Sequence, residues 1–324
     1  MVGMKVGCNK ATHKLWERIV GERSPLSPTR EDTSHLQALR DNPGLIFEYG
    51  NMTADKWQLE LLRDGTKKLM ICCSRQTGKS QTAAGKALLK ALLDPPATIL
   101  IVSKAQRQAA ELMRKVKELY RGYRGERIYR RRMSAKPLDL GSASTELARI
   151  DATGNYLPKL GDDEKPIQDS VHSIEMKNGS RIICLPGSAD TIVGYSSIDL
   201  LIIDEASRTP DQLYSALSPM RAVSQGQFLV LSTPFGKRGW FWEEWKRCVE
   251  KHEKGEKEPW KRYQVKVYDC PRITKEWLDE EKESVGNRWF RQEYECSFED
   301  TIDSVFAYED IHAMLNPNVQ PFDW

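Results

Sequence analysis

The chain has 324 residues, of which 40% are hydrophobic and 29% are charged, and its formal net charge is +3. This length suggests one large domain or two modest ones, and the composition is that of a globular protein with a buried core. No apolar run reaches the roughly 18 residues that a membrane span needs, and the N-terminus lacks the apolar stretch of a secretory signal, so we expect a cytoplasmic protein.

The seven cysteines and five histidines show no spacing typical of a metal site. Neither a Cys-x-x-Cys nor a His-Glu-x-x-His pattern occurs, and an odd number of cysteines argues against a disulfide framework. We therefore expect reduced, buried thiols.

The N-terminal residues 1–49 are expected to form an arm, because they contain a loop rich in Ser and Pro at Ser24–Arg30. From residue 50 onward, strand and helix patterns alternate, which predicts an α/β fold with a mostly parallel, doubly wound sheet over residues 50–268. After residue 268 the pattern becomes helical, so we expect residues 269–324 to form a small helical lid and a linker.

Buried strands are predicted where short β-branched or apolar runs lie between turns. The expected strands are residues 68–73, 98–103, 199–203, 227–231 and 262–268, with a hairpin of 171–176 and 181–185 around Asn178-Gly179. The main expected helices are residues 79–93, 104–120 and 240–251.

The first chemical motif is Ser74-Arg75-Gln76-Thr77-Gly78-Lys79-Ser80, between a buried strand and the start of a helix. Backbone N–H groups in such a turn attract phosphate oxygens, and Gly78 lets the backbone approach them. Lys79 reaches the β and γ phosphates, and Ser80 ligates Mg²⁺. The standard GxxxxGK[ST] pattern has glycine where this chain has Cys73. We predict a P-loop on a central strand, binding ATP and Mg²⁺ through Ser74, Arg75, Gln76, Thr77, Gly78, Lys79, Ser80 and Gln81.

The second motif is the pair Asp204 and Glu205, which ends an apolar strand. In a P-loop ATPase the first carboxylate holds the Mg²⁺ shell, and the second orients and deprotonates the attacking water. We therefore assign Asp204, with Ser80, to the metal, and Glu205, with Lys79, to catalysis.

Two weaker motifs flank these. Ser232, Thr233 and Pro234 end the next strand, where the two hydroxyls can sense the γ-phosphate and transmit hydrolysis to a moving element; a plain strand-to-turn junction has the same pattern.

The other weak motif is Trp57 and Gln58, which precede the first strand. A glutamine amide can read the N6 and N7 edge of adenine, and a nearby aromatic can stack on the base. A surface glutamine beside a core tryptophan is the alternative.

Taken in order, these motifs resemble the large terminase subunit of tailed bacteriophages. The resemblance covers about residues 50–310 and rests on WQ, SRQTGKSQ, TILIVSKAQRQAAELMRKV, LPGSADTIVGYS, LLIIDEASRTPDQLYSALSPM and LSTPFGKRGWFWEEW. It implies a P-loop ATPase in which Ser232, Thr233 and Pro234 couple hydrolysis to movement and Gln58 reads adenine. The missing first glycine, with Arg and Gln inside the loop, also resembles that family.

The family also implies partners and a place in the cell. Its members package double-stranded DNA as a homo-oligomeric ring on the portal protein of a procapsid, and a small terminase subunit delivers the DNA. We accordingly expect a protein of the bacterial host cytoplasm, docked on the procapsid during packaging and absent from the mature virion. Relatives usually continue into a nuclease domain. This chain ends at Trp324 without such a pattern, so we expect that it does not cut DNA itself.

The source of the essential arginine is open between two positions. One is Arg75 in the P-loop, acting in cis; the other is the arginine that many relatives carry in the TIxGYS segment, acting on a ring neighbour. This chain has Val193 at the second position, which favours Arg75, with Arg208 and the Arg130–Arg132 cluster as alternates. A purely structural role for Arg75, bracing the loop against an acid, is the other interpretation.

The basic tract Arg121–Lys136 is a candidate surface for DNA or for a neighbouring subunit, since tyrosines are interleaved with its Lys and Arg residues. A solvated loop has the same composition.

Two other functions are alternatives for the whole chain. A helicase-like DNA translocase needs a second motor domain, for which only 92 residues follow Ser232. A non-enzymatic DNA-binding protein does not need an intact ATPase site, so the presence of Lys79, Ser80, Asp204 and Glu205 argues against this alternative.

Overall fold

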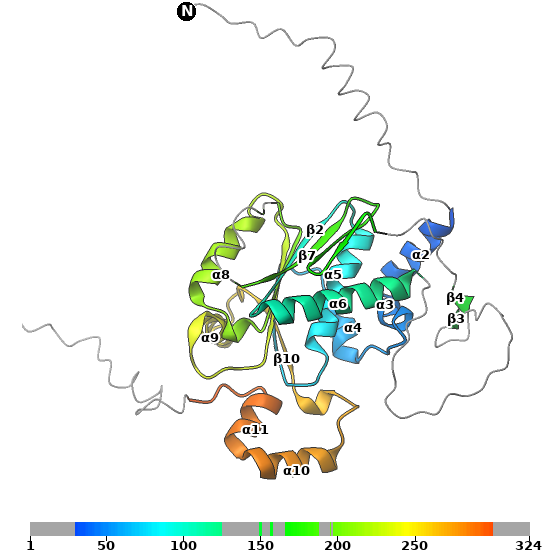
Figure 1. Cartoon of the computed structure of the whole chain (residues 1–324). Coiled ribbons are helices and arrows are strands. Elements are labelled where there is room, and N and C mark those ends of the chain that lie inside the picture. Colours follow the sequence, from blue (N-terminus) through cyan, green and yellow to red (C-terminus); the bar gives the residue numbers. More distant parts are fainter. Residues whose placement is uncertain are drawn as a thin grey trace, which may run out of the picture.

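The computed structural model describes residues 30–124, 149–150, 156–157, 166–187, 195 and 197–300. Its centre is an eight-stranded sheet with helices on both faces (Figure 1). The strand order is β10-β1-β9-β8-β2-β7-β6-β5. The strands are β1 (Lys68–Cys73), β2 (Thr98–Ser103), β5 (Gln168–Ser170), β6 (Ser173–Glu175), β7 (Arg181–Pro186), β8 (Leu200–Asp204), β9 (Gln227–Ser232) and β10 (Lys261–Val265). A separate antiparallel pair is formed by β3 (Arg149–Ile150) and β4 (Tyr156–Leu157).

The six strands from β10 to β7 are parallel to their neighbours, and only β6 and β5 are antiparallel. The α-helices are α2 (Arg30–Asp41), α3 (Leu45–Tyr49), α4 (Lys56–Arg63), α5 (Lys79–Leu93), α6 (Gln106–Tyr123), α8 (Asp211–Leu217), α9 (Gly239–Glu253), α10 (Lys275–Val285) and α11 (Asn287–Tyr294). Short 3₁₀ helices are η2 (Ala206–Arg208), η3 (Ser218–Arg221) and η4 (Val267–Asp269). The α/β fold predicted from the sequence is therefore confirmed, including the hairpin of β6 and β7.

Each face of the sheet has its own hydrophobic core, which explains why the central strands are apolar along their whole length. In β1, Leu69, Ile71 and Cys73 pack into the core that also contains side chains of α2 to α6. Met70 and Cys72 point to the opposite face and share a core with side chains of α8 and α9. The alternation of side chains along a strand thus anchors β1 from both sides.

Two sequence expectations need correction. The P-loop strand β1 is not central: it is second from one edge, because β10 alone lies outside it while β9, β8, β2 and three further strands extend the sheet on the other side. The expected arm is shorter than residues 1–49, because α2 and α3 belong to the folded domain. Leu39, Ile46 and Phe47 are almost fully buried in the same core as α5 and α6.

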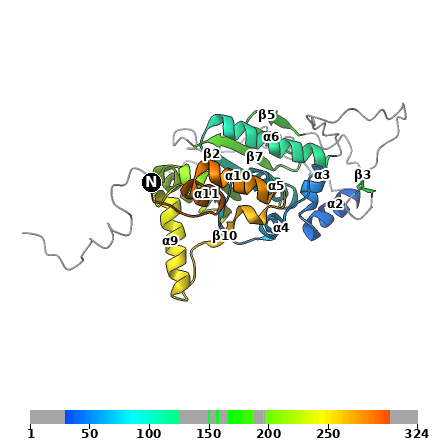
Figure 2. The same cartoon turned by 90° about the horizontal axis from the view of Figure 1, so that it is seen from below.

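The residues after η4 form two short helices with a small core of their own, built from Val267, Leu278, Phe290 and Tyr294. Thr274 caps α10 by accepting a hydrogen bond from the Trp277 N–H, and Gly286, with φ 79°, separates α10 from α11. In Figure 1 this pair (orange) lies below the sheet, and Figure 2 shows it from below. The helical character expected for the lid is confirmed over residues 275–294.

Within the described ranges, no helix is both long enough and apolar enough to cross a membrane. Some residues singled out from the sequence lie outside these ranges: Val193, the Arg130–Arg132 cluster, and the basic tract from residue 125 onward.

Candidate active site

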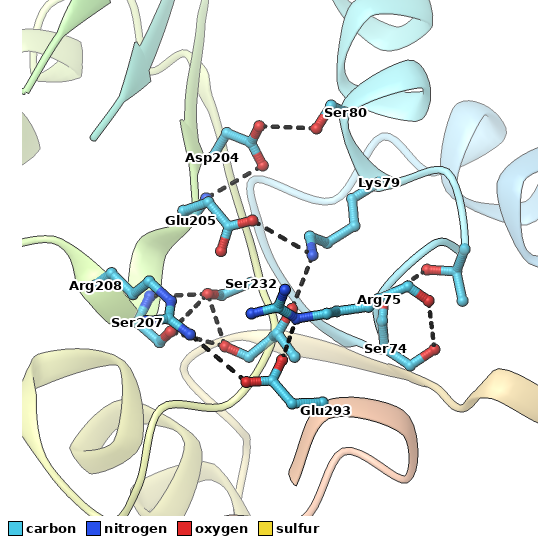
Figure 3. A network of polar contacts seen from close by, with 12 residues as sticks. Ser74, Arg75, Lys79, Ser80, Asp204, Glu205, Ser207, Arg208, Ser232 and Glu293 are labelled. Atoms are coloured by element: carbon cyan, nitrogen blue, oxygen red, sulfur yellow. Dashed lines mark hydrogen bonds and ion pairs between the residues drawn. The ribbon is translucent and has the colours of Figure 1, made fainter. Parts of the chain in front are cut away.

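The predicted catalytic residues meet because β1, β9 and β8 are consecutive parallel strands, whose carboxyl ends lie on one edge of the sheet. Ser74–Ser80 leaves that edge from β1, Ser232 ends β9, and Asp204 ends β8. The register aligns Cys72 with Ser232 and Asp204 with Leu231, so the three motifs end at the same height. Residues far apart in the sequence therefore converge on one side of the fold (Figure 3).

The P-loop is a turn that needs unusual backbone angles. Gln76 and Gly78 both have positive φ values, 62° and 91°, and α5 starts immediately afterwards at Lys79. The Thr77 hydroxyl donates to the Ser74 carbonyl at 2.9 Å, which closes the turn from inside. The Ser74 N–H donates to the Val265 carbonyl at 2.9 Å, so β10 holds the start of the loop.

The missing first glycine has a structural explanation. Cys73 is the last residue of β1, is paired with Val265 of β10, and has no exposed surface. At this position the chain is still an extended strand whose side chain enters the core, so no glycine is needed. Burial raises the pKa of the Cys73 thiol well above its ordinary value, which keeps the thiol neutral.

Lys79 lies at the centre of the site. Its Nζ donates to Thr233 Oγ1 at 2.8 Å and lies 3.4 Å from Glu205 Oε1. Burial alone lowers the pKa of a lysine, but the neighbouring carboxylates Glu205 and Asp204 outweigh it and raise the pKa of Lys79. Lys79 is therefore a buried, permanently charged ammonium group.

Ser80 and Asp204 face each other at the start of α5. The Ser80 hydroxyl donates to Asp204 Oδ2 at 3.0 Å. Burial and the negative charge of Glu205 raise the pKa of Asp204. Additional positive charge beside Asp204 would therefore stabilise its ionised form. A hydroxyl and one carboxylate fit Mg²⁺, which binds few protein ligands and completes its shell with water and phosphate oxygens. No group of three His, Cys, Asp or Glu that could hold a metal occurs among the described residues.

Glu205 adopts a left-handed backbone conformation, with φ 56° and ψ 43°. Such a conformation is uncommon for a residue other than glycine and is often found at functional sites. It ends β8 abruptly and precedes η2, and the Glu205 N–H donates to Asp204 Oδ1 at 3.1 Å. As a result, both carboxylates remain at the edge of the sheet, and Glu205 lines the same cleft as Lys79 and Ser80.

The predicted coupling motif joins the P-loop to η2. Thr233 accepts the hydrogen bond from Lys79, while Ser232 Oγ accepts from the Ser207 N–H at 3.0 Å and donates to Ser207 Oγ at 2.7 Å. Ser207 Oγ donates in turn to the Thr233 carbonyl at 2.7 Å. Pro234 follows and is buried. The motif is thus placed between Lys79 and the segment that contains Arg208.

Arg75 and Arg208 approach one carboxylate from two sides (Figure 3). Arg75 Nε lies 2.5 Å from Glu293 Oε2, and Arg208 lies 3.6 Å from Glu293 Oε1. The Glu293 side chain belongs to α11 and is only 8% exposed. Its hydrogen bond raises the pKa of Arg75 further. Arg208 also stacks on the ring of Phe235, at 4.0 Å from the ring centroid. No sequence motif pointed to Glu293.

The site opens into a cleft of about 540 Å³. It is lined by Arg75, Gln76, Gly78, Lys79, Ser80, Gln81, Lys104, Gln108, Lys115, Glu205, Arg208 and Thr233. Most of these residues were predicted; Lys104, Gln108 and Lys115 were not, although they belong to the segment TILIVSKAQRQAAELMRKV. The Gln81 amide nitrogen is buried without a hydrogen-bond partner among the described residues. A buried unpaired donor beside a cationic cleft suits a ligand rich in acceptors, such as a nucleotide.

The structure places Gln58 behind the P-loop and Trp57 in the core. Gln58 accepts from the Asp55 N–H at 2.8 Å and donates to Thr82 Oγ1 at 2.8 Å. Its amide nitrogen lies so close to Gly78 that a Cβ there would be 2.9 Å away. Trp57 is 7% exposed, within the hydrophobic core rather than in the cleft. The Arg272 guanidinium donates two hydrogen bonds, of 2.6 and 2.7 Å, to the Asp55 carboxylate, a contact that the sequence did not predict.

A turn of the P-loop pattern between β1 and α5, with a Ser80–Asp204 pair and the Glu205 carboxylate at the same edge of the sheet, is typical of a P-loop nucleoside triphosphatase fold. The family model described as "Terminase large subunit, T4likevirus-type, N-terminal" matches residues 70–313, more than half of the 324 residues. The chain belongs to this family.

Individual relatives agree with this assignment. The large terminase subunits of Thermus virus P23-45 and Thermus phage G20c are each 24% identical over 268 residues, which is 80% of this chain and 51% of the relative. The chain therefore spans about half the length of the curated relatives it matches.

Two solved structures show the same fold. The large terminase ATPase domain of Thermus phage P74-26 has a TM-score of 0.53 and 21% identity, covering 78% of this chain and 96% of that chain. The large terminase of another thermophilic bacteriophage has a TM-score of 0.51 and 13% identity, covering 76% of this chain and 53% of that chain.

Proposed function

We propose that this chain is the ATPase motor domain of a viral terminase large subunit, which hydrolyses ATP to translocate double-stranded genome DNA into a procapsid. The observation that carries the proposal is the convergence of Lys79, Ser80 and Glu205 in one cleft, with Asp204 bonded to Ser80. Membership of the terminase family supports the biological role. A solved large terminase from a thermophilic bacteriophage, with a TM-score of 0.50 to this chain, is described as a complex with ADP.

Binding of ATP is assigned to the P-loop and its surroundings. The N–H groups at the start of α5 and the Lys79 ammonium hold the β and γ phosphates, for which Lys79 exchanges its contacts with Thr233 and Glu205. Ser80 and Asp204 would hold Mg²⁺, and the ion would supply positive charge beside the phosphates. Gln58 remains the proposed adenine contact, in which its amide nitrogen exchanges the bond to Thr82 for the base.

Hydrolysis needs an attacking water, a base and a counter-charge. Glu205 orients the water and takes its proton while the water oxygen bonds to the γ-phosphorus. The bond between that phosphorus and the bridging oxygen breaks, ADP leaves with this oxygen, and the proton passes from Glu205 to the released phosphate. Arg75, which reaches the cleft from the P-loop, stabilises the charge on the γ-phosphate oxygens in cis. Ser232 and Thr233 connect this event to η2 and Arg208.

The partners follow from the same proposal. Double-stranded DNA is the cargo, the portal protein is the docking site, a small terminase subunit delivers DNA, and the assembled motor is a homo-oligomeric ring. It works in the host cytoplasm on the procapsid. We further propose that this chain does not cut DNA, a statement that Mg²⁺- or Mn²⁺-dependent nicking of plasmid by the pure protein would refute.

The test of the proposed function is ATP hydrolysis by paired variants. Glu205→Gln keeps the shape of the side chain and loses the base, so it should bind ATP while hydrolysing it roughly 10²–10⁴-fold more slowly. Lys79→Ala should lose binding as well, because a phosphate counter-charge disappears. Phosphate release and binding of a fluorescent ATP analogue measure the two effects separately. Normal hydrolysis by Glu205→Gln would reject the assignment.

A further inference from the structure

A second hollow of about 440 Å³ adjoins the nucleotide cleft. The two share Ser80, Gln108, Lys115 and Glu205, but the second is not lined by the P-loop residues before Ser80. Its inner end is formed by Ser80, Asp204 and Glu205, and its wall is the side of α6 that carries Arg107, Glu111 and Lys115. It is therefore a branch that leads away from the two catalytic carboxylates without passing the P-loop turn.

The fold explains why α6 lies beside the carboxylates. Strand β2 pairs directly with β8, with Val102 opposite Ile203, so the chain leaving β2 starts next to Asp204. Positions 107, 111 and 115 are four residues apart, which places them on one side of the helix. The opposite side packs Ala109, Met113 and Val116 against the core, so the orientation of α6 is fixed.

The charges in this branch are uneven. Asp204 and Glu205 at its inner end repel any anion, and Glu111 is already engaged by Arg114 at 2.6 Å. Arg107 and Lys115 form no hydrogen bond or close ion pair with other parts of the described chain, and both line the hollow. Both also interact with Glu111 between them, whose pKa is lowered mainly by Arg114 and further by Lys115 and Arg107. Lys115 also acts on Asp204 directly, since its charge lowers the pKa of a carboxyl group that burial raises.

We propose that this branch is the exit route of inorganic phosphate after ATP cleavage, with Lys115 at its inner end and Arg107 further out. The inference rests on the proposed hydrolysis of ATP. Once the γ-phosphate is detached, ADP still lies across the P-loop, so the dianion must leave on the other side, past Glu205. Lys115 offsets the repulsion from the two carboxylates there, and Arg107 attracts the ion onward. Focusing of an ion by paired cations in a narrow cleft changes rates by roughly 10–10³-fold.

The route favours a small anion over the phosphates of DNA. The hollow has a volume of about 440 Å³ and is lined at its buried end by Ser80, Asp204 and Glu205, which is room for a phosphate ion and not for a DNA duplex. A DNA-binding surface also has no need of contact with the two catalytic carboxylates.

The experiment compares Lys115→Gln and Arg107→Gln with the wild-type chain. Acid quench of radiolabelled ATP reports cleavage, and a fluorescent phosphate sensor reports release. Incorporation of ¹⁸O from water into the released phosphate counts how often cleavage reverses before phosphate escapes. Lys90→Gln is the control, because Lys90 pairs with Asp94 in the last turn of α5 and lines neither hollow.

We expect cleavage within about twofold of wild type in Arg107→Gln, whose side chain does not line the nucleotide cleft, with slower release. In Lys115→Gln, we expect release to be about tenfold slower relative to that variant's own cleavage, with more ¹⁸O per phosphate. Lys115→Arg should restore release, and added salt should slow the wild type more than Lys115→Gln. Equal slowing of cleavage and release, or unchanged release and ¹⁸O content, would overturn the route. So would a loss of DNA affinity with normal release. If the wild-type chain does not cleave ATP, the proposed function fails first and the inference with it.

Discussion

Arg75 and Glu293 are joined twice, once through the backbone and once through the side chains. The Arg75 N–H donates to the Glu293 carbonyl at 2.9 Å, and Arg75 Nε donates to the Glu293 carboxylate at 2.5 Å. One residue belongs to the P-loop and the other to α11 of the lid, so a group that touches the nucleotide cleft is held by the lid. The lid also holds Arg208 through the same carboxylate.

Removing the charge of Glu293 should strengthen ATP binding. Glu293→Gln keeps the backbone bond to Arg75 but no longer opposes the phosphates or neutralises the two arginines. Because Arg75 is half exposed, the gain is small, about 2- to 5-fold in the dissociation constant. Calorimetric titration with ATP measures it. The control is Glu299→Gln, since Glu299 pairs with Arg291 on the same part of the chain but does not line the cleft. Weaker binding in Glu293→Gln contradicts the interpretation.

Arg75→Ala should abolish hydrolysis while sparing nucleotide binding. An arginine at the γ-phosphate contributes roughly 10³–10⁵ to the rate of phosphoryl transfer. Arg208→Ala, which removes the other arginine held by Glu293, should have the smaller effect. If the arginine acts in cis, specific activity depends little on protein concentration. A steep rise with concentration, with Arg75→Ala still active, points instead to an arginine from a neighbouring subunit.

Gly78→Ala should damage the P-loop in two ways. Gly78 has φ 91°, which an L side chain adopts only with strain of about 1–2 kcal/mol. The new Cβ would also lie 2.9 Å from Gln58 Nε2 and push the glutamine off Thr82. We expect a lower melting temperature and weaker ATP binding. Gly65→Ala is the control, because nothing lies within 4 Å of a Cβ there. Equal melting temperatures for both variants would show that the loop absorbs the change.

The sequence predicted the parts of the site that depend on local pattern. The strands before Ser74, Asp204 and Ser232 are apolar because they are buried on both faces, and this property is visible in a single chain. Because parallel strands end on one edge, the motifs that follow them had to meet. The position of β1 in the sheet was not predictable in this way, because β10 pairs outside it through a contact between residues far apart in the chain.

The lid contacts could not be predicted from the sequence. Glu293 and Arg272 belong to polar segments with no motif, and their roles come from distant partners: Arg75 and Asp55. The same holds for Lys115, whose position beside Asp204 follows from the pairing of β2 with β8. For Trp57, a motif suggested a contact that the structure does not show. The sequence indicated stacking on the base, whereas Trp57 packs in the hydrophobic core.

The last prediction concerns stability at low pH and depends on Asp64, which follows α4. Its carboxylate is 6% exposed and lies 2.6 Å from Lys261 Nζ. It also accepts hydrogen bonds from Tyr263 Oη at 2.6 Å and from the Thr66 N–H at 2.8 Å. Burial alone raises the pKa of Asp64, but these three donors outweigh it and hold the pKa well below its ordinary value. Asp64 thus connects the end of α4 to β10, at the edge of the sheet opposite the P-loop.

Because the pKa of Asp64 is lower in the folded state than in the unfolded state, its contribution to the unfolding free energy decreases at low pH. The stabilisation is fully present above the unfolded-state pKa of about 3.9 and is lost as the pH falls below it, because the unfolded chain then takes up the proton more readily. Asp64→Asn should therefore lose about 1–3 kcal/mol of unfolding free energy at pH 7, and the loss should shrink as the pH falls below about 4. Urea unfolding from pH 7 to pH 3 measures this. Asp94→Asn is the control, since Asp94 is about half exposed in its pair with Lys90 and should change stability little. A constant difference between Asp64→Asn and wild type across this range would mean that packing, and not the charge of Asp64, accounts for the loss.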